Sequence, residues 1–288
     1  MRLAQIRQGD RLVAVIVENR NARLKGSWGV RPVSEPWSLV EVIQRAEASG
    51  QSLSEFVLSH ASSPIEAELA IPISPAEVWA AGCTYEASSS FRDAEHGTRE
   101  GFYAQVYGAE RPEIFFKGTA RHCVGHRGGI GIRSDSKFTA PEPELAVILN
   151  SQGEALGYTL ANDVSAWDIE RENPLYLPQS KVYTACCALG PVIVTSDELQ
   201  DPYSLTLTCR IERGAKTIFE GSTSTSRMNR KIEDIVAYLR RCNSIPGGTV
   251  LCTGTGIIVE ESAALEPGDC VTIECAAIGT LSNPTGIV

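Results

Sequence analysis

The sequence lacks any long apolar segment. No apolar run approaches the roughly 20 residues that a membrane-spanning helix needs. Residues 1–10 also lack the apolar centre of a secretory signal peptide. We therefore expect a cytoplasmic protein that does not act at a membrane.

Basic residues are in the minority. Lysine and arginine number 26 against 35 aspartate and glutamate residues, which gives a formal net charge of −9 at pH 7. Nucleic acids and anionic lipid surfaces are bound by basic patches, so this balance argues against both partners. A local positive pocket for a small ligand remains compatible with it.

The nine cysteines form no CxxC pair, which argues against a zinc site. They are odd in number and scattered, and several lie in apolar runs. We interpret them as buried, reduced thiols, as expected in the cytoplasm. The histidines share no spacing typical of metal ligands on one helix face; they are His60, His96, His122 and His126.

Residues 1–75 are predicted to form a small α+β domain. Two apolar runs flank a Gly-Asp pair at residues 9–10, which is typical of a hairpin turn. Ser38 is placed to cap a helix that ends at Gly50, and a second short helix is expected at residues 53–58.

Residues 76–288 are predicted to form a second, β-rich domain. Short apolar runs alternate with Gly, Pro and Asp, and a single amphipathic helix is expected at residues 232–239. The fold class is therefore α+β with an excess of strands. The expected strands include residues 113–116, 145–149, 156–160, 192–194, 205–211, 256–259 and 270–275.

The most informative motif is Pro-Glu-Pro-Glu-Leu at residues 141–145. Glu142 and Glu144 are two residues apart, so in a strand both carboxylates project to the same side. A predicted hairpin with its turn at residues 150–154 brings Asp163 roughly opposite Glu144. Three carboxylates around one point repel one another, and a bound Mg²⁺ or Mn²⁺ ion would offset that repulsion. The motif alone is weak evidence, because charged residues in strands also protect sheet edges.

Four segments together resemble the fumarylacetoacetate hydrolase family. They match it in order and spacing over about residues 76–288, and they are residues 141–149, residues 157–165, Lys181 with residues 188–191, and residues 253–256. The resemblance implies a mixed β-roll domain that binds a divalent cation: Mg²⁺, or else Mn²⁺ or Ca²⁺. It also implies a homodimer or a dimer of dimers.

The resemblance assigns roles to five residues. Glu142, Glu144 and Asp163 would be the metal ligands. Lys181 would face the substrate beside the metal, and Thr253 would close the far side of the pocket.

Two departures from the family pattern bear on the chemistry. Where carbon–carbon hydrolases of the family carry a water-activating His and Glu, this chain has Ser88 and Phe91. Neither side chain acts as a general base near neutral pH, although the pair Glu95-His96 is an unaligned substitute. Family hydrolases read Arg after Asn-Asp-x-Ser-Ala, and Gln three residues later. This chain has Trp167 at the Arg position and so lacks a guanidinium there to anchor a distal carboxylate or carbonyl of the substrate.

Further segments resemble the family's sugar-acid dehydratases, which act on 2-keto-3-deoxy pentonates; these segments are residues 107–117, 131–136 and 172–183. That subgroup also reads Arg where this chain has Trp167. We therefore predict a Mg²⁺-dependent lyase that dehydrates a 2-keto-3-deoxy sugar acid, and a pentonate would give 2,5-dioxopentanoate. The alternatives are a hydrolase or decarboxylase of an acylpyruvate or oxaloacetate, and a homologue that binds a keto acid without turnover.

Candidate residues for this reaction each have a structural alternative. Lys181 is a base, an oxyanion partner, or a cation that neutralises the carboxylates. Glu113 would transfer a proton to the leaving hydroxyl, or else face solvent at a strand end. Tyr85, Lys117 and Thr253 are candidate substrate contacts, and Tyr85 and Lys117 could equally serve packing alone.

Overall fold

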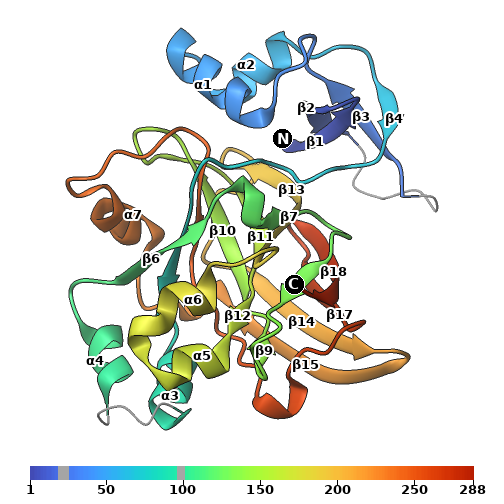
Figure 1. The fold of residues 1–288 in the computed structure, drawn as a ribbon. Coiled ribbons are helices and arrows are strands. Elements are labelled where there is room, and N and C mark those ends of the chain that lie inside the picture. Colours follow the sequence, from blue (N-terminus) through green and yellow to red (C-terminus); the bar gives the residue numbers. More distant parts are fainter. Residues whose placement is uncertain (19–25, 96–100) are drawn as a thin grey trace.

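The computed structural model describes residues 1–18, 26–95 and 101–288 (Figure 1). Within them, no helix is long and apolar enough to cross a membrane. All nine cysteines lie in these ranges and are free, and six of them are buried.

The first 75 residues form the predicted hairpin and two capped helices. Ser38 and Ser52 each accept a hydrogen bond from the third helical residue, whose glutamate bonds back to the serine backbone, so both helices begin with a capping box. Gly50, at φ 72°, ends the first helix as predicted. The elements are β1 (Arg2–Gln8), β2 (Arg11–Val17), β3 (Trp28–Pro32), α1 (Leu39–Ser49), α2 (Leu53–Ser59) and β4 (Ile65–Ala67).

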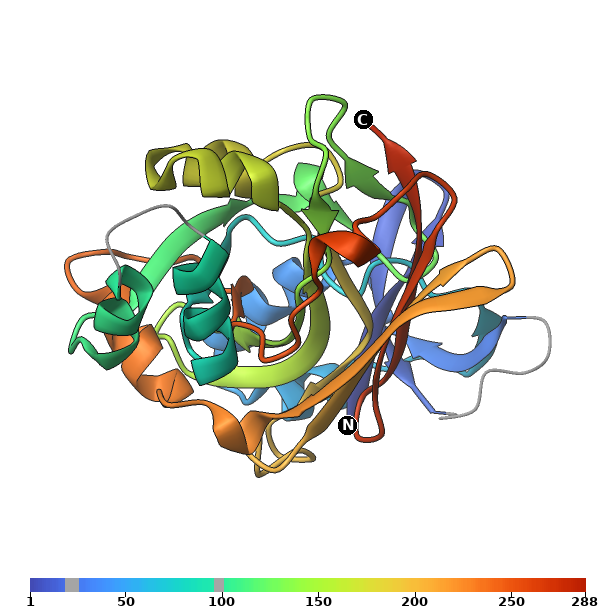
Figure 2. The ribbon, with the colours of Figure 1, turned by 90° about the horizontal axis from the view of Figure 1, so that it is seen from below.

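Most strands belong to one curved 11-stranded sheet, whose order is β4-β3-β2-β1-β13-β11-β10-β16-β5-β6, with β7 also paired to β13 (Figure 2). Strand β1 joins the N-terminal strands to the rest, because Leu3 pairs with Ile193 of β13. The predicted domain boundary near residue 75 stays a prediction. The further strands are β5 (Val78–Gly82), β6 (Glu113–Gly118), β7 (Cys123–Val124), β10 (Pro143–Leu149), β11 (Ala155–Asp163), β13 (Cys187–Thr195) and β16 (Thr249–Cys252).

A five-stranded sheet, β15-β14-β17-β18-β8, packs beside the large one, and β9 pairs with β12 alone. The bounds are β8 (Ile130–Ile132), β9 (Thr139–Ala140), β12 (Ser165–Ala166), β14 (Thr206–Arg213), β15 (Lys216–Ser224), β17 (Cys270–Cys275) and β18 (Gly279–Ile287). Residues 256–259 were predicted as a strand and form none. Ile257 and Val259 are nevertheless buried, so their apolar character reflects packing in an irregular segment.

The expectation of a single helix after residue 76 is wrong. The amphipathic helix is present as α7 (Ile232–Arg240), with its apolar stripe buried. Four further helices gather at the end of the molecule opposite α1 and α2 (Figure 1). They are α3 (Glu86–Glu95), α4 (Phe102–Gly108), α5 (Trp167–Glu172) and α6 (Leu177–Lys181). They are short or rich in serine and charge, so their sequences carry no long apolar period.

Candidate metal and substrate site

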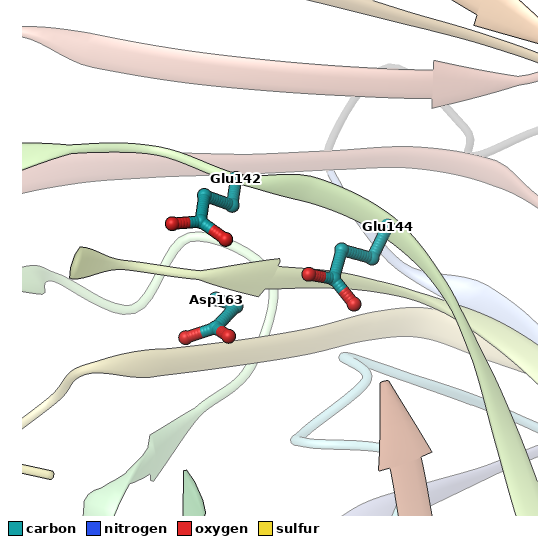
Figure 3. A group of neighbouring side chains, drawn as sticks. All are labelled: Glu142, Glu144 and Asp163. Atoms are coloured by element: carbon teal, nitrogen blue, oxygen red, sulfur yellow. The ribbon is translucent and has the colours of Figure 1, made fainter. Parts of the chain in front are cut away.

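Glu142, Glu144 and Asp163 meet as predicted. Each offers a carboxylate oxygen within 4.8 Å of the others, and Figure 3 shows the three side chains converging from neighbouring strands. All three are at most 5% exposed. The spacing of two between the glutamates therefore places both carboxylates on one side of the chain.

The register between β10 and β11 differs from the prediction by two residues. Glu144 pairs with Ala161, and Asp163 lies opposite Glu142, whose carbonyl accepts a 3.0 Å hydrogen bond from the Asp163 backbone N–H. The β10–β11 pairs are centred between Gln152 and Gly153, so Asp163 falls opposite Glu142. A bulge interrupts the pairing beside Leu149. Asp163 still reaches both glutamates because the three side chains share a face.

Two buried lysines compensate the carboxylates. Lys181 Nζ lies 2.7 Å from Glu142 Oε1 and 3.4 Å from Asp163 Oδ2, and it donates to Ser165 Oγ at 2.6 Å. Lys117 Nζ lies 2.5 Å from Asp163 Oδ1. When all five groups are ionised, three carboxylates and two ammonium groups leave one net negative charge among side chains that are at most 5% exposed.

The electrostatics follow from burial and these charges. Burial, then the charges of Asp163 and Glu142, raises the pKa of Glu144 well above its usual value of 4.5. Burial also raises the pKa of Glu142, against the opposing effect of Lys181. Burial opposes ionisation of Asp163, but Lys117 and Lys181 outweigh it and hold its pKa below the usual value.

The donor set fits a hard divalent cation. Within the described part of the chain, Glu142 Oε2 and Glu144 Oε1 accept no hydrogen bond, while the other oxygen of each is held by Lys181 or by the backbone N–H of Gly254. Each of these two buried side chains, whose pKa is raised, therefore has one oxygen free for a ligand, and carboxylate oxygens suit Mg²⁺. Glu142, Glu144 and Asp163 are the residues that would hold the ion.

Lys117 and Thr253, both predicted substrate contacts, are engaged with the protein itself. Besides its ion pair with Asp163, the Lys117 ammonium donates hydrogen bonds to the carbonyls of Val164 at 2.9 Å and Lys181 at 2.6 Å. Thr253 Oγ1 donates to the Leu145 carbonyl at 2.8 Å. In this structure both residues hold the site together.

Glu113 and Tyr85 line two cavities. Glu113 begins β6 and is 19% exposed, and it borders a cavity of about 340 Å³ together with Tyr103 and Glu170. Tyr85 borders another, of about 410 Å³, together with Tyr107. Burial, and then the charge of Glu144, raises the pKa of Tyr85, so its hydroxyl stays protonated near neutral pH.

The positions that depart from the hydrolase pattern are packed into the protein. Ser88 is buried on α3. The Phe91 and Trp167 rings pack edge to face, with their centroids 5.3 Å apart. Trp167 is 4% exposed and also contacts Phe138. Of the substitute pair, His96 lies outside the described residues, and so does the side chain of Glu95.

Sequence reasoning missed three polar residues here. Ser165 bridges Lys181 and the Asp163 carbonyl, and it had been noted only as part of the Asn-Asp-x-Ser motif. Arg92 and Glu170 form a buried ion pair at 3.6 Å. Arg92 lies in a segment without an apolar period, so its sequence gave no signal. Glu170 could have been found, because it stands where the hydrolases read Gln.

Comparisons with known proteins agree with this geometry. The model for the fumarylacetoacetate (FAA) hydrolase C-terminal region matches residues 93–285. The chain belongs to the fumarylacetoacetate hydrolase family. Within that family it is 53% identical, over 74% of its length and 72% of the relative's, to 2-dehydro-3-deoxy-D-arabinonate dehydratase of Saccharolobus solfataricus.

A second relative and a solved structure are also similar over most of the chain. A probable 2-keto-3-deoxyxylonate dehydratase of Haloferax volcanii is 44% identical over 79% of this chain and 75% of its own length. The solved structure of 2-keto-3-deoxy-D-arabinonate dehydratase complexed with magnesium and 2,5-dioxopentanoate superposes with a TM-score of 0.85. It is 40% identical and covers 100% of this chain and 99% of its own.

Replacing Glu144 with Gln should remove most of the metal affinity, because one of three charged ligands is lost. We expect Mg²⁺ to bind at least about 100-fold more weakly by isothermal titration calorimetry, because mutating only a group that orients a metal ligand already costs about 10–100-fold. Glu220→Gln, at an exposed position on β15, is the matched control. Unchanged Mg²⁺ binding by Glu144→Gln would show that the ligand set is wrong.

Metal-free protein should lose stability as the pH rises above about 4.5. A carboxyl whose folded-state pKa is raised binds protons more tightly when folded, so stability falls from the unfolded pKa up to the raised one. We expect the melting temperature in EDTA to fall over this window, and Glu144→Gln or added Mg²⁺ to reduce the fall. An identical slope in wild type and Glu144→Gln would contradict the assignment.

Proposed function

We propose that this protein is a Mg²⁺-dependent dehydratase that converts a 2-keto-3-deoxy pentonate into 2,5-dioxopentanoate and water. What carries the proposal is the buried carboxylate triad, in a chain whose full length superposes on a solved dehydratase that holds magnesium and 2,5-dioxopentanoate. The two dehydratase relatives, at 53% and 44% identity, support the same reaction class.

The charge left in the site suits a chelating substrate. A Mg²⁺ ion held by Glu142, Glu144 and Asp163 supplies Lewis-acid polarisation of the keto group of a 2-keto acid, which makes its C3 protons acidic. Asp163 is held for this task at both oxygens, by Lys117 and Lys181. Glu142 is held through its backbone N–H, which donates to Asn162 Oδ1 at 3.1 Å.

We assign Lys181 to electrostatic stabilisation. Burial disfavours its ammonium form, but Asp163 and Glu142 outweigh burial and raise the pKa above its ordinary value. The side chain therefore carries a proton near neutral pH and stands ready to stabilise negative charge that develops on the substrate. A role as an unprotonated base would require this balance to reverse.

Glu113 is the proposed proton carrier. Loss of water breaks one C3–H bond and the C4–OH bond, so one proton leaves C3 and one joins the departing hydroxyl. The unsaturated keto acid that forms then tautomerises: protons leave C5 and its hydroxyl and return to C4 and C3, which gives 2,5-dioxopentanoate. Glu113 is the partly exposed carboxylate at the cavity that Glu170 also borders, and a carboxyl group in such a place can perform both transfers. Ser88 and Phe91 offer no base for the attack of water that carbon–carbon hydrolysis requires.

The reaction can be tested directly. Purified protein with 2-keto-3-deoxy-D-arabinonate and Mg²⁺ should form 2,5-dioxopentanoate, measured with a coupled aldehyde dehydrogenase, and EDTA should stop the reaction. Glu113→Gln should lower kcat by about 10²–10⁴-fold while Mg²⁺ binding persists. Glu220→Gln is again the control. Failure to dehydrate any pentonate stereoisomer would overturn the proposal, and cleavage of an acylpyruvate would favour the hydrolase alternative.

We also propose that the chain assembles as a homodimer or a dimer of dimers. The family resemblance supports this assembly. Light scattering coupled to size-exclusion chromatography should give at least twice the chain mass of 31.0 kDa. A mass of one chain at micromolar concentration would contradict it.

Finally, we propose a cytoplasmic location. Its support is the state of the cysteines, all nine of which are free, with six buried. Reduced, buried thiols are typical of proteins kept in a reducing compartment.

A further inference from the structure

Arg92 is a buried charge for which the carboxylate triad gives no explanation. It lies on α3 and is 2% exposed. Its Nη1 donates to Glu113 Oε2 at 3.2 Å and lies 3.6 Å from Glu170 Oε1. A buried guanidinium is costly unless it is paired, so these two carboxylates account for its presence.

The same contact fixes Glu113. Its cross-strand partner is Gly82 of β5, and a Cβ at Gly82 would overlap Glu113 Oε2. The Glu113 carboxylate therefore lies over a position that only glycine leaves open, with Arg92 at its end. The absence of a Cβ at Gly82 permits this placement, and one charge-assisted hydrogen bond from Arg92 sets the direction of the carboxylate.

The ring of Trp167 supports the guanidinium. The Arg92 Cζ atom lies 5.3 Å from the Trp167 ring centroid and 5.5 Å from that of Tyr103, which are cation–π distances. Trp167 stands where family hydrolases read Arg. In this chain a guanidinium thus comes from α3 and rests on the indole that replaces the family's arginine on α5.

The bonding of Arg92 is poor for a purely structural ion pair. One nitrogen, Nη1, serves both carboxylates, although a guanidinium fork can bind a carboxylate with two parallel bonds. Among the described residues, Arg92 Nε and Glu170 Oε1 are buried without a hydrogen-bond partner. Unsatisfied buried groups cost stability, so an arrangement selected for stability alone would pair them.

We propose that Arg92 is a positioning residue for the dehydration, which holds the Glu113 carboxylate at the substrate cavity and offsets the charges of Glu113 and Glu170. This inference rests on the proposed function, because it takes Glu113 as the proton carrier. Arg92 itself acts through Glu113. Glu113 and Glu170 both line the cavity of about 340 Å³, and in this proposal the reacting part of the substrate lies there, beside Glu113.

The test is a double-mutant cycle on Arg92 and Glu113, with 2-keto-3-deoxy-D-arabinonate and Mg²⁺. Arg92→Gln should lower kcat by about 10²-fold, within the range of general acid–base effects, and change KM less than about threefold. Arg92→Lys keeps the charge and should recover at least part of kcat. In the Glu113→Gln background, Arg92→Gln should cost less than about threefold, since the residue it positions is gone.

Several results would overturn the inference. Unchanged kcat in Arg92→Gln would do so, as would an equally large loss in the Glu113→Gln background. A loss of kcat that only follows a loss of folded protein would show a structural role. The Gln and Lys variants would then have equally lowered melting temperatures and equally lowered activity relative to wild type.

A crystal structure of Arg92→Gln separates this inference from the proposed function. We expect the Glu113 carboxylate to move away from its place over Gly82, and an unmoved carboxylate would contradict the positioning role. This readout needs no turnover. If wild-type protein dehydrates no pentonate, the proposed function fails while the displacement of Glu113 still decides what Arg92 holds.

Discussion

The mutual repulsion of three buried carboxylates is the constraint on which the site depends. At 1–5% exposure, water does little to screen Glu142, Glu144 and Asp163 from one another. The positive charges of Lys117 and Lys181 offset two of the three negative charges. One negative charge remains, and one oxygen of each glutamate accepts no hydrogen bond. Burial and repulsion therefore raise the pKa of both glutamates, and a small bound cation would offset the remaining charge.

The surrounding fold is arranged to keep that cluster rigid. Strand β11 brings Asp163 between β10 and β13 in the middle of the large sheet, where both edges of the strand are hydrogen-bonded. The ammonium of Lys117 on β6 ties this centre to α6, because it also donates to the Lys181 carbonyl. A lysine expected to bind substrate thereby fixes both Asp163, a candidate metal ligand, and the end of the helix that carries the second lysine.

Local patterns predicted the parts of the site that depend on neighbouring residues. The spacing of Glu142 and Glu144, and the turn before β11, follow from strand geometry and turn chemistry. The register was wrong by two residues, because an approximate pairing does not resolve which residue faces Asp163. The helices α3 to α6 and the contacts of Arg92 could not be predicted, since they depend on tertiary packing between segments that carry no regular apolar period.

Two of the departures from the hydrolase pattern lie side by side. Phe91 and Trp167 occupy positions where hydrolases carry a carboxylate and a guanidinium, and here their ring centroids lie 5.3 Å apart, edge to face. This apolar contact joins α3 to α5 and leaves no carboxylate at the position where hydrolases carry one. The indole then forms the surface on which Arg92 rests, one position after Phe91. The position that lacks the hydrolase carboxylate and the guanidinium directed at Glu113 therefore meet in the same packing between α3 and α5.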